Sequence, residues 1–101
     1  MHIKFMVPDP GKRTISVVIK NRDGVLFEGE AKALTSINER GIFDILPLHE
    51  NFISVIKDFI RIIKFNGQEE FKITQGVLKA IENKVNVYVG FGGEKRITQT
   101  K

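Results

Sequence analysis

The stretch Asn51–Lys64, with the sequence NFISVIKDFIRIIK, decides between a mixed fold and an all-β fold. Its polar residues fall three or four positions apart and its apolar residues fill the opposite face, which is typical of an amphipathic helix. The stretch is also rich in isoleucine and phenylalanine, which are mediocre helix formers and pack well on a pleated sheet. We predict two strands here, and one helix remains the alternative.

The composition around this stretch favours strands throughout the chain. Isoleucine and valine together number 23 in 101 residues, whereas alanine and leucine together number 8. Side chains that branch at Cβ suit a pleated sheet, and alanine and leucine are the residues that a helix prefers. We therefore predict one all-β domain, a sandwich or a barrel, without disulfides because the chain has no cysteine.

Turn signals divide the chain into strand pairs. Asp23-Gly24, Asn66-Gly67 and Glu82-Asn83 each lie between segments that read as strands. At Asn66-Gly67 both residues tolerate positive φ angles, so we predict a type I′ turn there. Gly29 lies inside a predicted strand and indicates a bulge or a bend.

The same pattern divides the chain into three segments. Residues 1–12, which contain Pro8 and Pro10, are predicted to form an N-terminal arm. Residues 13–89 form the β domain, and residues 90–101 form a flexible tail.

The charge pattern favours a solvated surface over a nucleic-acid track. The net charge is +4 and the isoelectric point is about 9.5, but the basic residues are scattered along the chain. Proteins that bind nucleic acid cluster such residues against a row of phosphates. A small β-barrel that binds single-stranded nucleic acid remains the alternative, because the eight phenylalanines are able to stack on bases. Core packing accounts better for most of them, including Phe27, Phe43, Phe65 and Phe71.

The sequence offers little for catalysis, and we predict no catalytic residue, no cofactor and no metal site. The chain has two histidines and no cysteine, which leaves a zinc site short of ligands. Asp44 and His49 lie near one another in the sequence, and we interpret them as a local polar contact rather than an acid–base pair.

The densest motif is Glu39–His49, with the sequence ERGIFDILPLH. We interpret it as a loop, a short strand and a rigid segment that leaves the strand, because Pro47 fixes φ and has no N–H to donate. A rigid projecting edge of this kind suits docking onto another protein. The candidate partner-binding residues are Arg40, Gly41, Ile42, Asp44, Pro47, Leu48 and His49.

Three blocks of the chain resemble the N-terminal domain of the epsilon subunit of F-type ATP synthase, which is called delta in mitochondria. Asp23–Glu30 is similar to the family's Asp-Gly-x-x-Phe-x-Gly-Glu, and Gly41–His49 is similar to Gly-x-Leu-Gly-Ile-Leu-Pro-Gly-His. A third block, from Glu69 to Val89, resembles the stretch around Gly-Gly-x-Leu-x-Val. The resemblance covers residues 14–89 and also favours strands in residues 51–64.

The resemblance implies a flattened β-sandwich of two roughly five-stranded sheets. It implies a non-catalytic rotor subunit of the central stalk, without cofactors, that docks on the gamma subunit while loops at one end rest on the membrane c-ring. Ion-driven rotation would then be coupled to ATP synthesis. By the same resemblance, the subunit is present in one copy, is a monomer when isolated, and lies peripherally on the cytoplasmic face of the cell membrane. Its Pro-x-His loop, near these contacts, corresponds to Pro47 and His49.

The chain departs from the family pattern at several positions. After Val89 no helical pattern follows, so we expect the inhibitory C-terminal helical hairpin to be missing. Leu48 stands where the family has a glycine, and Gln75 replaces one of two paired glycines. Asp58-Phe59 replaces a Pro-Gly turn, within the stretch that has the helical spacing.

Overall fold

All regular structure in the part of the chain that the structure describes is β-strand. The structure is a computed structural model and describes residues 13–90 and 95–100. This confirms the all-β prediction, whereas the predicted arm, residues 1–12, lies outside the described residues. The strands are β1 (Ile15–Asn21), β2 (Gly24–Ala31), β3 (Ala33–Asn38), β4 (Gly41–Ile45), β5 (Phe52–Lys64), β6 (Gly67–Ile81), β7 (Lys84–Val89) and β8 (Lys95–Thr100).

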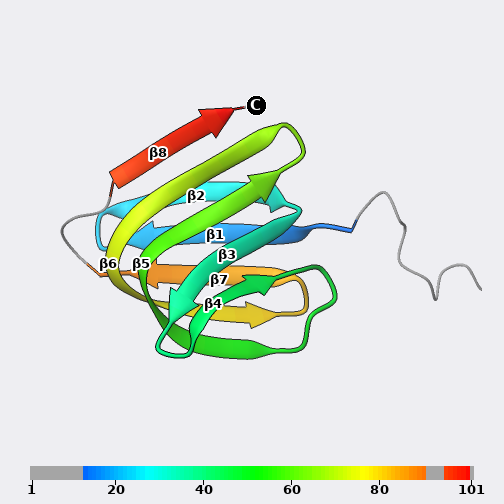
Figure 1. Ribbon diagram of the computed structural model, residues 1–101, viewed down its shortest axis with the longest axis horizontal. Helices are drawn as coiled ribbons and strands as arrows, with labels where there is room; N and C mark the ends of the chain where they lie inside the picture. The colour runs from blue at the N-terminus through cyan, green and yellow to red at the C-terminus, as the bar shows by residue number, and fades with distance from the viewer. Residues whose placement is uncertain (1–12, 91–94, 101) are drawn as a thin grey trace, which may run out of the picture.

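The strands form two layers that share β5 and β6 (Figure 1). The first layer has the order β2-β1-β7, followed by the second half of β6 and the first half of β5. The second layer begins with β8 and the first half of β6, followed by the second half of β5, β3 and β4. Each layer therefore has five strands, as expected, and the hydrogen-bonded path between them is continuous.

The two long strands bend at a bulge. In β5 the pairing with β6 shifts register between Lys57 and Asp58, so that Thr74 of β6 has no partner residue. Asp58 has a φ of 69°, a left-handed conformation that aspartate tolerates better than most residues. A bulge bends a strand without ending it. The helix alternative for residues 51–64 is therefore wrong, and the two predicted strands are one continuous strand.

The helix-like spacing in β5 has a simple cause in the two-layer fold. Ile56, Ile60 and Ile62 point inward and are fully buried. Ile53 and Val55 point outward from the first layer and are exposed. Apolar residues on both faces of one strand break the alternation that identifies a half-buried strand, and they leave a spacing that resembles a helix.

The hairpins lie where the sequence predicts them, but the turn between β5 and β6 does not have the predicted geometry. Glu82 and Asn83 have φ angles of 50° and 66°, which is the type I′ pattern. The loop between β5 and β6 consists of Phe65 and Asn66, and only the following Gly67 has a positive φ, of 142°. The type I′ prediction for Asn66-Gly67 is therefore wrong, because Gly67 is already the first residue of β6 and pairs with Lys64.

Two further local predictions need correction. Gly29 pairs in register with Val17, and the register shift between β1 and β2 lies instead between Ile19 and Lys20. The flexible tail predicted from residue 90 is not flexible throughout, because residues 95–100 form β8 on the edge of β6. Backbone pairing with an open edge depends little on side-chain composition, so the sequence of the tail did not indicate it.

The core lies between the layers and draws aliphatic side chains from both. Phe71 of the second layer is 2% exposed and contacts Phe27 of the first layer edge to face, with ring centroids 6.2 Å apart. Phe43 is partly buried and packs against the core. Phe65 is 72% exposed at the tip of its hairpin, so its assignment to the core was wrong. Hairpin tips lie beyond the end of the layered core.

Candidate functional site

Strand β4 separates the predicted partner-binding residues into two groups at opposite ends of the sandwich (Figure 1). Arg40 and Gly41 lie at the β3–β4 turn. Pro47, Leu48 and His49 follow β4, in the loop that leads to β5. The structure therefore does not bring these residues together into one compact site.

At the first end, side-chain amides stabilise two similar hairpin turns. The Arg40 N–H donates to Asn38 Oδ1 at 2.8 Å, and the Asp23 N–H donates to Asn21 Oδ1 at 2.8 Å. Each turn is followed by a glycine with a positive φ, 121° at Gly41 in the β3–β4 turn. This explains why glycine is needed there, since other residues are strained at such angles. The turns expose charged side chains, Arg22 and Asp23 in one and Glu39 and Arg40 in the other.

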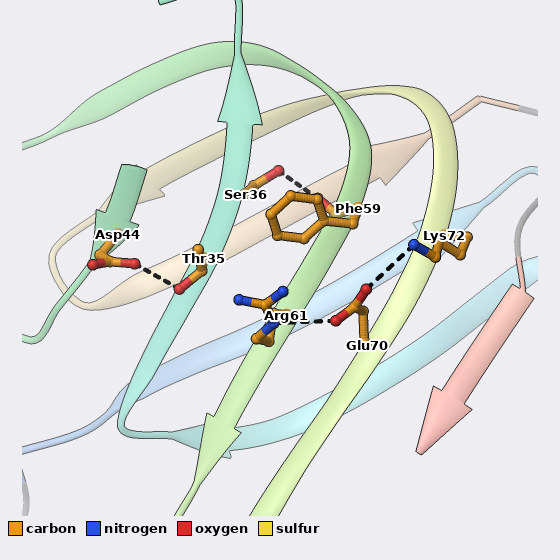
Figure 2. A network of polar contacts seen from close by, with 7 residues as sticks. All are labelled: Thr35, Ser36, Asp44, Phe59, Arg61, Glu70 and Lys72. Carbon is orange, nitrogen blue, oxygen red and sulfur yellow. Dashed lines mark hydrogen bonds and ion pairs between the residues drawn. The ribbon is translucent and has the colours of Figure 1, made fainter. Parts of the chain in front are cut away.

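Between the two ends, the outer face of the second layer carries polar contacts that are paired within the chain (Figure 2). The Thr35 hydroxyl donates to Asp44 Oδ1 at 2.6 Å. On the next strands, Arg61 Nε lies 3.1 Å from Glu70 Oε1, and Lys72 Nζ lies 3.5 Å from Glu70 Oε2. Asp44 is therefore engaged with Thr35, and the described charged side chains named here are paired within the chain.

Asp44 and His49 do not form the local polar contact with one another that the sequence suggested, because each is hydrogen-bonded elsewhere. Asp44 and His49 line one small cavity of about 250 Å³, but each has its own hydrogen-bond partner. His49 Nδ1 lies 2.5 Å from the carbonyl oxygen of Glu50. Within residues 13–90, the described part with side chains, no group of three or more potential metal ligands is found. The described residues also include no helix long and apolar enough to cross a membrane.

At the second end, a neighbouring turn holds the loop that contains Pro47. The Leu48 N–H donates to Asn83 Oδ1 at 2.6 Å, and Asn83 lies in the β6–β7 turn. Leu48 has a φ of 68°, a conformation that suits glycine better than leucine. Leu46 and Leu48 are both exposed at this end. The sequence marks Asn83 only as a turn residue, because its partner Leu48 lies 35 positions away.

We expect Asn83→Gly to destabilise the protein more than Glu82→Gly. Glycine keeps the left-handed φ at both positions, but only the first change removes the amide that binds Leu48. The difference should be about 1 kcal/mol, a typical value for one hydrogen bond. Urea unfolding of the two variants measures it. Equal stabilities would show that the Asn83 side chain does not hold the loop.

A row of exposed apolar side chains lies on the outer face of the first layer, and of the predicted partner-binding residues Arg40 alone lines a cavity with part of that row. Val55, Val77 and Tyr88 lie abreast on β5, β6 and β7, since Val55 pairs with Val77 and Val77 pairs with Tyr88. Their exposed fractions are 58%, 48% and 55%, and the neighbouring Ile53 is 65% exposed. We call these four residues the apolar stripe. A contiguous exposed row of this kind marks an interaction site more often than scattered single residues do.

The apolar stripe was not predicted from the sequence, although one signal was present. Outward positions of a half-buried strand are normally polar. In β5, β6 and β7, however, Val55, Val77 and Tyr88 occupy outward positions beside buried apolar residues. Apolar residues at both inward and outward positions of three strands were the available sign of a second apolar face.

Comparison with known proteins agrees with this architecture. A family model described as the β-sandwich domain of the ATP synthase delta/epsilon chain matches residues 14–90. An ATP synthase epsilon chain from a Nitratiruptor species is 28% identical over 78 residues, which are 75% of this chain and 60% of the relative. The chain thus spans less than two thirds of that relative.

Two solved structures share the fold. A chain of the Euglena gracilis mitochondrial ATP synthase, in a structure of its OSCP, F1 and c-ring, superposes with a TM-score of 0.73 at 12% identity. The match covers 95% of this chain and 67% of that one. A chain from the central stalk and c-ring of the Tetrahymena thermophila enzyme gives 0.66 at 14% identity, covering 79% and 66%. With the family model matching most of its length, this chain belongs to the delta/epsilon-chain family of ATP synthase.

Proposed function

We propose that this chain is a non-catalytic rotor subunit of an F-type ATP synthase that binds the gamma subunit and the c-ring. In this role it helps to transmit ion-driven rotation to the catalytic head, on the cytoplasmic side of the membrane. The observation that carries the proposal is the apolar stripe, an exposed face on a domain of this family. An apolar face of a small domain is stabilised when another protein covers it.

The asymmetry of the molecule supports separate surfaces for the two partners. The stripe lies on the first layer, whereas the second layer carries paired charges. We assign the stripe, together with Pro47, Leu48 and His49 at the second end, to the gamma subunit. The charged turn that contains Arg40 and Gly41, at the first end, we assign to the polar loops of the c-ring. Ile42 and Asp44 then lie on β4 between the two contacts.

Reconstitution with the partners tests this proposal. The tagged full chain is expected to retain the gamma subunit and the c-ring from the same organism on an affinity column, in a one-to-one ratio with gamma. A well-folded chain that retains neither protein would contradict the proposal. No ATPase activity is expected of the chain alone.

The burial of several phenylalanines weakens the nucleic-acid alternative. It depended on phenylalanines that stack on bases, but Phe27 and Phe71 are buried in the core. Tyr88 is the exposed aromatic residue of the stripe, and lysines surround it. Single-stranded nucleic acid therefore serves only as a competing ligand for the groove that Tyr88 and the lysines line.

We expect Pro47→Ala to weaken gamma binding more than it weakens the fold. Proline restricts the loop before assembly, so alanine adds conformational entropy that binding must remove. The expected loss of affinity is about threefold to tenfold, and the loss of folding stability is below about 1 kcal/mol. Titration calorimetry and urea unfolding measure the two effects. An unchanged gamma affinity would exclude the loop from the interface.

A further inference from the structure

A groove of about 480 Å³ lies beside the part of the apolar stripe that β6 and β7 contribute. Val77 and Tyr88 of the stripe line it together with Lys20, Lys79 and Lys84. The lysines come from three strands, β1, β6 and β7. The groove therefore combines an apolar wall with a concentration of positive charge.

The register of the strands sets the lysines around the stripe. Lys20 of β1 pairs with Tyr88. It therefore lies next to Tyr88 in the row that Val55, Val77 and Tyr88 form across the strands. Lys79 pairs with Ile53 and lies two residues after Val77 on the same face of β6. Lys84 lies on the same face of β7 as Tyr88, four residues before it. The arrangement is an apolar centre with a cationic rim.

These lysines differ from the basic residues on β5 and β6 in the second layer. There, Arg61 and Lys72 both contact Glu70, and Lys64 Nζ lies 2.7 Å from Glu69 Oε2. Among the described side chains, no carboxylate lies within ion-pair distance of Lys20, Lys79 or Lys84. Among the described residues, Glu82 is the one acidic residue that lines the groove, so this lining carries three positive charges and one negative charge.

We propose that the partner surface covering the apolar stripe presents apolar side chains ringed by carboxylates, which pair with Lys20, Lys79 and Lys84. The proposal rests on the proposed function, and it specifies the chemistry of the gamma surface that binds here. Complementary charges at the rim of an interface accelerate association and select the partner, while the apolar centre supplies most of the affinity. Lysines that make no ion pair with the described side chains are available for this role.

The test compares two sets of lysine-to-glutamine changes in the full chain. The triple variant Lys20→Gln, Lys79→Gln and Lys84→Gln removes the rim charges. Lys72→Gln is the matched control, because Lys72 is also an exposed lysine of β6 but lies in the second layer. Thermal unfolding of each variant checks the fold, and the single Lys79→Gln variant replaces the triple variant if that one does not fold.

Binding to the purified gamma subunit is measured by surface plasmon resonance at low and high salt. The triple variant should bind about tenfold more weakly at about 50 mM salt, mainly through slower association, and the gap should close near 500 mM. The single Lys79→Gln variant should lose about twofold to threefold, while Lys72→Gln stays within about twofold of the parent.

Three other outcomes of this binding experiment would each overturn a specific claim. Gamma binding by the triple variant with the affinity and salt dependence of the parent chain would overturn the carboxylate rim and leave the proposed function intact. A parent chain that does not bind gamma at either salt concentration would overturn both. Tighter binding of the parent chain to single-stranded oligodeoxythymidine than to gamma, lost in the triple variant, would assign the lysines to nucleic acid instead.

Discussion

A Val77→Asp variant is expected to fold like the parent protein and to lose at least about 100-fold in affinity for the gamma subunit. Val77 lies at the centre of the apolar stripe, between Val55 and Tyr88. It is 48% exposed in the isolated chain, so an aspartate there remains hydrated and the fold tolerates it. In the complex the same carboxylate would be buried without a partner.

The size of this effect follows from the cost of burying an unpaired charge. Removing one partner of a buried ion pair costs about 3–5 kcal/mol, and an isolated carboxylate in an apolar interface is in a similar position. Because about 1.4 kcal/mol changes an equilibrium constant tenfold, the loss is at least about 100-fold. If the neighbouring lysines reorient toward the aspartate, the loss of affinity for gamma falls toward about 100-fold.

Val77→Thr is the matched control for this experiment. Threonine keeps the shape and the strand preference of valine, so it should cost no more than about tenfold in affinity. Surface plasmon resonance measures both affinities, and circular dichroism with thermal unfolding confirms that both variants are folded. Gamma binding by the aspartate variant within about threefold of the parent would exclude the stripe from the interface.

The largest effect on stability is expected from Phe71→Ala. Phe71 is 2% exposed and joins the layers through its edge-to-face contact with Phe27. Truncating a buried phenylalanine to alanine costs about 3–5 kcal/mol, because the cavity is not refilled. That is a large part of the total stability of a typical small domain, about 5–15 kcal/mol. The melting temperature should fall by roughly 15–30 °C.

Phe65→Ala provides the control, since it removes the same side chain at the tip of the β5–β6 hairpin. Phe65 is 72% exposed, and Lys32 Nζ lies 5.5 Å from the centroid of its ring. We expect a loss below about 1 kcal/mol, the usual range for an exposed cation–π contact. Urea unfolding of the two variants gives both values. Comparable losses would show that Phe71 is not part of a closely packed core.

Several features of the fold could be predicted because their causes are local. The excess of isoleucine and valine predicted an all-β protein. Turn residues marked the hairpins after Asn21, Lys64 and Ile81, since a turn depends on the φ preferences of two to four adjacent residues. The bend at Asp58 was not predictable in the same way. It depends on how β5 pairs with β6, and a strand can bend without any proline or glycine.

The proposed docking surface was less predictable than the fold. The candidates from Arg40 to His49 form one continuous segment, and β4 carries them from one end of the sandwich to the other. The apolar stripe, in contrast, takes its residues from three strands, and it becomes visible only when β5, β6 and β7 are paired in register. The tether between Asn83 and Leu48 likewise joins residues 35 positions apart.

The sequence by itself determined that this chain forms strands, where most of its hairpins turn, and which family it resembles. Side-chain shape and turn chemistry act on neighbours a few residues away, so they can be read along the chain. Only the tertiary structure decided which apolar side chains face the core and which remain outside. Ile56 and Val55 are adjacent and similarly apolar, yet one is fully buried and the other is exposed. The side of a strand that meets the second layer is set by packing between distant segments, and this assignment leaves the apolar stripe free for a partner.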